Sequence, residues 1–152
     1  MPNHVFTIVC RGLSVDAQTN SLTLFGVIES IGADQFPAVI PDLAIATLFT
    51  RNQGEQGLTF TYQARLLDPD GNKVFAANAE FTLEKPRHRT LTRIQLLSIE
   101  KSGRYSLEIF LRPKEQADWG EPVATYPIEV TGASGKESEL FEDAPSRKPV
   151  SS

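Results

Sequence analysis

Hydrophobic and polar residues alternate with a period of two along much of this chain. The alternation is cleanest over Gly57–Leu67. One parity there is apolar: Leu58, Phe60, Tyr62, Ala64 and Leu66. The other parity is polar: Thr59, Thr61, Gln63 and Arg65. Because successive side chains of a strand point to opposite faces, this pattern predicts a strand with one buried face and one solvated face.

Short runs rich in β-branched and aromatic residues lie between closely spaced Gly and Pro residues, which is typical of strands separated by turns. We predict eight strands: His4–Arg11, Ser21–Ile31, Leu43–Thr50, Gly57–Leu67, Lys73–Leu83, Thr90–Ile99, Arg104–Leu111 and Pro122–Val130. No segment keeps a 3.6-residue apolar period, and only a short helical turn is expected around Phe36–Asp42. This pattern predicts an all-β fold, a single antiparallel β-sandwich or barrel.

Three local signals refine the strands. In Ser21–Ile31 we expect Leu22, Leu24 and Ile28 to share one face with Gly26, and Gly26 itself predicts a bulge or a close backbone approach. The segment Asp68-Pro-Asp-Gly-Asn predicts a hairpin turn, because Pro presets the first turn position and Gly accepts a positive φ. Pro127 removes a ladder donor from the last strand, which predicts that this strand lies at a sheet edge.

The chain changes character near its C-terminus. Residues 132–152 consist mainly of Gly, Ser, Pro and charged residues, with Leu140 and Phe141 as the large apolar side chains. Such a segment buries too little apolar surface to offset the entropy of ordering it. We therefore expect a β-sandwich domain over residues 1–131 and a flexible polar tail over 132–152.

Composition narrows the function. The 152 residues include one Cys and two His, which excludes disulfide frameworks and Cys/His zinc sites within one chain. A formal charge of −4 argues against a nucleic-acid binder. We find no secretory signal and no apolar run long enough to cross a bilayer, so we expect a cytoplasmic protein without membrane contact. The unpaired Cys10 fits a reducing compartment.

Three stretches carry a family resemblance: SLTLFGVIESI (Ser21–Ile31), FPAVIPDLAIATLF (Phe36–Phe49) and ARLLDPDGNKVF (Ala64–Phe75). Together they resemble a family of small bacterial proteins known only as a domain of unknown function, over roughly Val5–Val130. The resemblance implies an immunoglobulin-like or C2-like β-sandwich, with no established activity and no functional residues to carry over. Separately, Gly103-Arg104-Tyr105 resembles the Gly-x-Tyr strand opening of immunoglobulin-like sandwiches.

One basic cluster stands out on this acidic chain. It comprises Lys85, Arg87, His88, Arg89 and Arg93. Such a patch raises the local concentration of anions. Because aromatic residues are not interleaved with it, single-stranded nucleic acid is a poor match. The cluster is either a solvated, solubilising loop or a contact for an acidic protein partner.

Two further features are candidate partner contacts. Trp119, the only Trp, lies in a polar connection and either packs back on the sandwich or serves as an exposed anchor. Leu140 and Phe141 lie among acidic residues in the tail, where such a segment can dock into a groove on another protein. The alternative is a tail without a binding role.

The acidic loops permit a calcium hypothesis, because Ca²⁺ prefers several oxygen ligands. Asp70 belongs to the predicted hairpin turn, and Asp16, Asp34 and Asp42 could converge on the same end of a C2-like sandwich. The plain turn is the simpler interpretation. His4, His88 and Cys10 lie in no recognisable catalytic motif, and the chain has no nucleophile elbow, P-loop or zinc-protease signature.

Taken together, the sequence predicts a non-enzymatic protein-interaction or scaffold module without a cofactor. An exposed edge strand would also allow a homo-oligomer. The alternative is an ion- or ligand-binding sandwich that takes Ca²⁺ at the acidic loops or an anion at the basic loop over residues 85–93. A carboxylate-based enzyme is a third hypothesis, which no motif supports.

Overall fold

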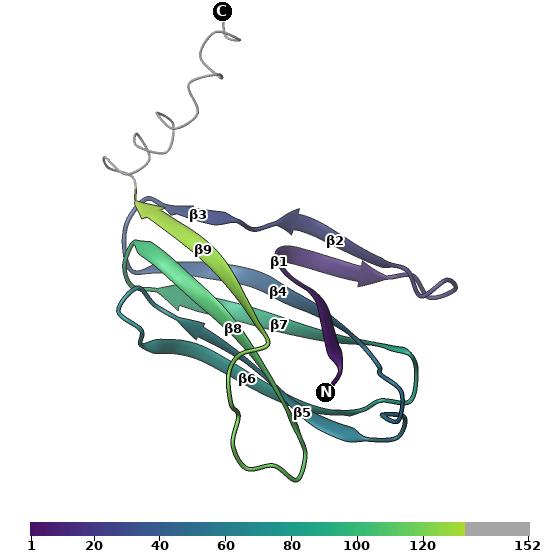
Figure 1. Cartoon of the computed structure of the whole chain (residues 1–152). Helices are drawn as coiled ribbons and strands as arrows, with labels where there is room; N and C mark the ends of the chain where they lie inside the picture. The colour runs from purple at the N-terminus through teal and green to yellow at the C-terminus, as the bar shows by residue number, and fades with distance from the viewer. Residues whose placement is uncertain (133–152) are drawn as a thin grey trace, which may run out of the picture.

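The computed structural model describes residues 1–132. These residues form nine strands and no helix (Figure 1). The strands are β1 (Asn3–Val15), β2 (Leu22–Val27), β3 (Ser30–Ala33), β4 (Ala38–Thr50), β5 (Thr59–Leu67), β6 (Lys73–Thr82), β7 (Arg87–Ile99), β8 (Gly103–Pro113) and β9 (Ala124–Gly132). No helix that could cross a membrane is found in this part of the chain.

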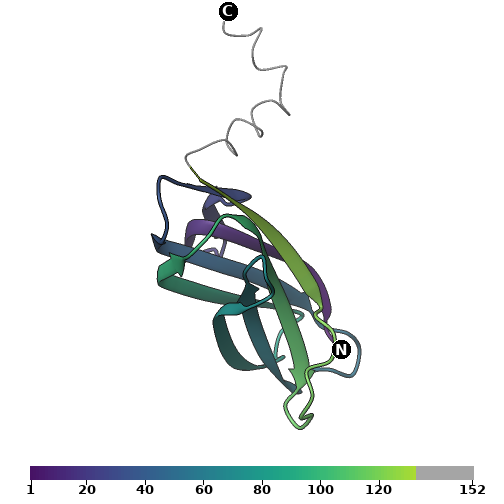
Figure 2. The same cartoon turned by 90° about the vertical axis from the view of Figure 1, so that its left-hand side faces the viewer.

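The strands form two sheets that pack face to face as two layers (Figure 2). The four-stranded sheet has the order β2-β1-β4-β7, and the five-stranded sheet has the order β3-β9-β8-β5-β6. Neighbouring strands run antiparallel except for β3 and β9, which are parallel. The predicted all-β sandwich is confirmed.

The core lies between the inner faces of the two sheets. The alternation of β5 is confirmed, since Phe60, Tyr62, Ala64 and Leu66 are all buried. They pack against inward side chains of the four-stranded sheet, such as Phe49. Burial of each large apolar side chain contributes about 1.5–3 kcal/mol.

Two turns that the sequence signalled are built as expected. In the β5–β6 hairpin, Oδ1 of Asp68 accepts hydrogen bonds from the amides of Asp70 and Asn72, both at 2.9 Å. At the start of β8, the buried Tyr105 donates its hydroxyl to the carbonyl of Lys101 at 2.8 Å. Both contacts fix the chain reversal from within the turn.

The predicted strand Ser21–Ile31 is wrong as a single strand. It divides into β2, in the four-stranded sheet, and β3, in the five-stranded sheet. Ile28 lies at the crossing, where its amide donates to Val9 O at 2.7 Å and its carbonyl accepts from the Tyr126 hydroxyl at 2.5 Å. Gly26, with φ of 62°, provides the close approach to a neighbour, because a Cβ there would lie 3.3 Å from Arg11 Cγ.

The predicted helical turn over Phe36–Asp42 is also wrong. Strand β4 already begins at Ala38, which pairs with Ile99 of β7. The two prolines, Pro37 and Pro41, provide no amide hydrogen for a helical turn and bias the residue before each of them toward an extended backbone. The extended conformation allows this segment to lengthen β4.

The edge position predicted for the last strand is wrong as well. Strand β9 lies between β3 and β8. Its pairing with β3 begins only at Glu129, whereas Pro127 lies opposite Ser106 of β8. Pro127 therefore precedes the β3 ladder, and its missing N–H breaks no bond to β3.

Candidate functional site

The main hollow of interest lies on the outer face of the four-stranded sheet. Strand β1 pairs with β4 over residues 3–10 and with β2 over residues 10–15. Beyond Cys10 it leaves β4, and together with β2 it forms a hairpin that runs back over β4 and β7 (Figure 1). The hairpin tip reaches β7, where Arg89 Nη2 donates to the carbonyl of Asn20 at 2.7 Å.

The space between hairpin and sheet is a groove of about 530 Å³, which we call the outer groove. Its lining residues are Phe6, Ile8, Ser21, Leu22, Leu24, Leu48, Arg87 and Arg89. The register explains this set, because Phe6 pairs with Leu48, and Leu48 pairs with Arg89. The outer groove therefore has apolar walls and an arginine rim.

The two arginines of the rim, and Arg93 on the same strand, have no anionic partner in residues 1–132. The ion pairs found there do not involve Arg87, Arg89 or Arg93. Arg87 and Arg93 are exposed, and all three occupy alternate positions of β7, on its outer face. Exposed Leu91 lies between them. This strip of β7 offers positive charge and apolar surface together.

The hairpin tip is held in shape by its own hydrogen bonds. Oδ1 of Asp16 accepts from the amides of Gln18 and Thr19, both at 2.8 Å. These bonds lower the pKa of the Asp16 carboxyl below its usual value, that of Thr19 contributing most. Asn20 takes a positive φ of 62°, which Asn tolerates better than most residues. The carbonyl of Asn20 is thereby oriented toward Arg89.

The structure divides the predicted basic cluster. Arg87 and Arg89 line the outer groove, and Arg93 continues their row on the same face. Lys85 is exposed in the loop before β7. The His88 ring instead turns inward and stacks on Phe81, with a centroid distance of 4.0 Å and an interplanar angle of 9°. Burial lowers the pKa of His88, so it does not extend the positive face.

Trp119 lies far from this groove, on the outer face of the five-stranded sheet. Its ring packs edge-on against Phe110 at 6.2 Å, and the Arg112 guanidinium lies 4.2 Å above it. The Arg65 guanidinium lies over the Phe110 ring, 4.3 Å from its centroid. Trp119 is half-buried and covers Phe110, as in the alternative in which it packs back on the sandwich. Leu140 and Phe141 lie outside the described residues.

The aspartates of the calcium hypothesis do not converge. In the part of the chain that the structure describes, no group of three or more His, Cys, Asp or Glu could hold a metal ion. Asp68 accepts hydrogen bonds from the backbone amides of its turn, and Asp70 forms an ion pair with Lys101. Asp16 is likewise engaged by its own turn.

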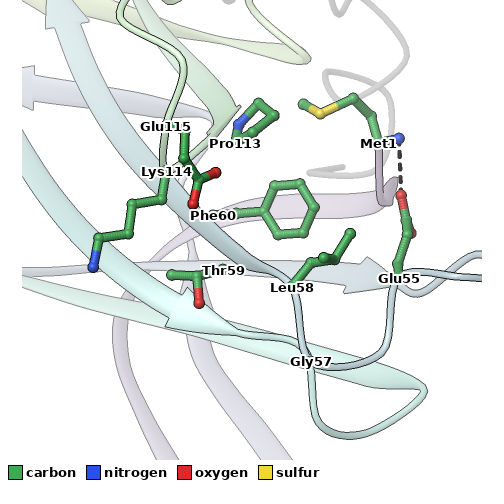
Figure 3. Close-up of a pocket in the computed structure, with 9 residues that line it drawn as sticks. All are labelled: Met1, Glu55, Gly57, Leu58, Thr59, Phe60, Pro113, Lys114 and Glu115. Carbon is green, nitrogen blue, oxygen red and sulfur yellow. Dashed lines mark ion pairs between the residues drawn. The ribbon is translucent and has the colours of Figure 1, made fainter.

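A second hollow, of about 490 Å³, lies where β5 begins and β8 ends (Figure 3). Phe60, Leu58 and Pro113 form its apolar part. Its buried carboxylate, Glu55, pairs with the Met1 ammonium at 2.8 Å and accepts the amide of Asn52 at 2.6 Å. Burial raises the pKa of Glu55, but these partners outweigh burial and lower it overall. Because Glu55 is already engaged, this hollow offers a ligand less than the outer groove does.

Residues 5–130 of this sandwich match the model of a family of unknown function, DUF6941. The chain belongs to this family. The resemblance read from the three sequence stretches is thereby confirmed as that of a domain of unknown function. No curated protein matches the chain.

Solved structures similar to this chain share little sequence with it. A glycosyl hydrolase family 2 member from Bacteroides cellulosilyticus matches 62% of the chain at 10% identity, with a TM-score of 0.46. The match covers only 13% of that chain. A CARDB domain from Pyrococcus furiosus matches 86% of this chain and 94% of its own at 10% identity and a TM-score of 0.44. The PmoD soluble domain from Methylocystis matches 86% and 98% at 13% identity and a TM-score of 0.38.

Sequence reasoning missed the apolar walls of the outer groove. The residues concerned lie in predicted strands, but the sequence does not show that these strands come together around one groove: Phe6, Ile8, Leu22, Leu24 and Leu48. A signal was present in β4, because Leu43–Phe49 is buried at every position and carries no charge. A strand that is apolar at both parities is covered on both faces. The pattern therefore indicates that a further element covers the face of β4 that does not pack on the five-stranded sheet. In the structure this element is the hairpin of β1 and β2.

Proposed function

We propose that this domain is a non-enzymatic protein-interaction module that binds an acidic segment with large apolar side chains in the outer groove. The observation that carries the proposal is the combination of apolar walls with Arg87 and Arg89 at the rim, neither paired with an acid in residues 1–132. A purely apolar partner would leave Arg87 and Arg89 unpaired, and a purely acidic partner would leave the apolar walls uncovered.

The chemistry of such a contact follows from the lining. Leu or Phe side chains of the partner would enter between Leu24 on the hairpin and Leu48 on the sheet. Each apolar side chain buried there contributes about 1.5–3 kcal/mol. Carboxylates beside them would accept charge-assisted hydrogen bonds from Arg87 and Arg89. After the costs of association, a short peptide of this type reaches a Kd on the order of 1–100 μM.

A labelled peptide tests the proposal. The probe is a dye-labelled synthetic octapeptide, Ser-Asp-Asp-Leu-Phe-Asp-Asp-Ser, titrated with the full chain and followed by fluorescence anisotropy. Binding in the micromolar range is expected, and Arg87→Glu should weaken it at least about tenfold through repulsion of the aspartates. Lys73→Glu is the matched control, because Lys73 is exposed on β6 of the other sheet and its reversal changes the net charge equally.

Two further titrations define the chemistry. Replacing Leu-Phe of the probe by Ala-Ala should abolish saturable binding, since the groove walls then have no partner. Inorganic phosphate in place of the peptide separates anion binding from peptide binding. Equal affinity of the original and Ala-Ala probes, or equal loss with Arg87→Glu and Lys73→Glu, would refute the proposed function.

A further inference from the structure

The sequence contains a segment with the chemistry that the outer groove requires. Residues Glu137–Asp143 read Glu-Ser-Glu-Leu-Phe-Glu-Asp, so Leu140 and Phe141 are flanked by two acidic residues on each side. The apolar pair matches the walls of the groove, and the four carboxylates match the row of Arg87, Arg89 and Arg93. The segment follows the sandwich directly, so each copy carries one segment and one groove.

Chain length decides whether a copy could fill its own groove. The described chain ends at Gly132, which pairs with Ala33 and lies against Phe36, at the end of the sandwich where β4 begins. The outer groove lies at the opposite end of β4, around Leu48. Figure 2 shows the end of β9 and the N-terminus, from which β1 leads into the groove, at opposite ends of the molecule.

The distance exceeds the reach of the segment. Ten residues of β4 separate Ala38 from Leu48, which is about 33 Å at 3.3 Å per residue. Eight residues separate Gly132 from Leu140, and even a fully extended chain of that length spans only about 28 Å. The path must also pass from the five-stranded sheet around to the outer face of the other sheet. A copy therefore cannot bring Leu140 to the centre of its own groove, around Leu48.

We propose that the segment Glu137–Asp143 of one copy occupies the outer groove of a second copy. This inference rests on the proposed function, because it names the occupant of that groove. Two copies that exchange their segments fill both grooves and close into a dimer. Once the first segment is bound, the second binds within the same complex at a high effective concentration, which strengthens a contact that is weak on its own.

Sedimentation velocity of the full chain tests the inference. At tens of micromolar and low salt we expect a dimer that dissociates as salt rises, because the contact is partly electrostatic. Leu140→Ser/Phe141→Ser and, separately, Arg87→Glu should each raise the dimer dissociation constant at least about tenfold. Lys73→Glu should leave it unchanged. A monomeric full chain, or a dimer unaffected by both variants, would overturn the inference.

Mixing the two variants supplies a positive test. The Leu140→Ser/Phe141→Ser variant keeps an intact groove, and the Arg87→Glu variant keeps an intact segment. A trace of the first, labelled with a dye, should sediment faster in an excess of unlabelled Arg87→Glu chain. It should sediment as a monomer in an excess of its own unlabelled form. Identical sedimentation in both mixtures would count against segment exchange.

The synthetic octapeptide separates failure of this inference from failure of the proposed function. Its binding to the Leu140→Ser/Phe141→Ser variant depends on the groove alone. If the peptide binds this variant while the full chain is a monomer, the groove is a peptide site and the segment exchange is wrong. If the peptide does not bind and the chain is a monomer, both proposals are wrong.

Discussion

Replacing Gly103 by Ala should destabilise the sandwich severely, and the structure allows the cost to be divided. Gly103 opens β8 with φ of 132°, and a Cβ there would lie 2.5 Å from Cγ and 3.0 Å from Cβ of Pro69 in the β5–β6 turn. The backbone conformation alone costs a non-glycine residue about 1–2 kcal/mol. Forcing a methyl group against a rigid proline ring adds about 1–3 kcal/mol. We expect a total loss of about 3 kcal/mol.

Gly54→Ala is the matched control. Gly54 also has a positive φ, of 85°, but a Cβ there would meet nothing within 4 Å. It should therefore cost only the backbone term, about 1 kcal/mol. For a fold of this size, thermal unfolding should show a Tm lower by about 10 °C for Gly103→Ala and by about 4 °C for Gly54→Ala.

A double-mutant cycle isolates the contact. Pro69→Ala removes the Cγ that lies closest to the added methyl group, so the pair should couple favourably by about 1–2 kcal/mol. Chemical unfolding of the four chains gives this coupling free energy. Equal decreases in the free energy of unfolding for Gly103→Ala and Gly54→Ala, or a coupling free energy of zero, would show that contact with Pro69 is not the reason for glycine at position 103.

The remaining predictions concern single sites. Leu96 is 72% exposed and has a φ of 59°. Leu96→Gly should therefore relieve backbone strain and raise the free energy of unfolding by up to about 1 kcal/mol. The control Leu91→Gly, in a regular part of the same strand, should lower the free energy of unfolding. Tyr105→Phe should cost about 1 kcal/mol because it leaves the Lys101 carbonyl without its donor. Tyr62→Phe should cost less, because the Tyr62 hydroxyl has no partner in good hydrogen-bond geometry and only approaches Thr47 and Thr92. Equal losses in chemical unfolding would contradict this. Burial lowers the pKa of His88 and His4 in the folded chain, so the unfolded chain binds protons more readily. The free energy of unfolding should therefore have its full value above about pH 6.5 and should fall as the pH drops through that value. His88→Asn should reduce the difference in unfolding midpoint between pH 7.5 and 5.5.

The fold was largely predictable because strand signals are local. Alternation over Gly57–Leu67 and the turn at Asp68–Asn72 depend on neighbouring residues, and both were confirmed. The division of Ser21–Ile31 was not predictable in this way, because the change of sheet is decided by Val9 and Tyr126, which are distant in sequence. The position of β9 was missed for the same reason, since its partner β3 emerged only from that division.

The candidate site was predictable only in its charged half. Arg87, Arg89 and Arg93 alternate along the sequence, and a single strand suffices to place them on one face. His88 interrupts that row with the opposite parity, and its inward orientation could have been read from the same alternation. The apolar walls come from three strands, and the bend of β1 after Cys10 that brings Leu22 over Leu48 is a tertiary property.

Methyl NMR of the Leu140→Ser/Phe141→Ser variant with the octapeptide tests the central claim most directly, because it reports where the peptide binds in a chain whose own segment does not compete for the groove. The methyl groups of Ile8, Leu22, Leu24 and Leu48 should shift progressively and saturate together. The methyl groups of Leu66 and Ile109, buried between the sheets, should not move. Shifts confined to the surroundings of Trp119, or no shifts at saturating peptide, would contradict the assignment of the outer groove as the binding site.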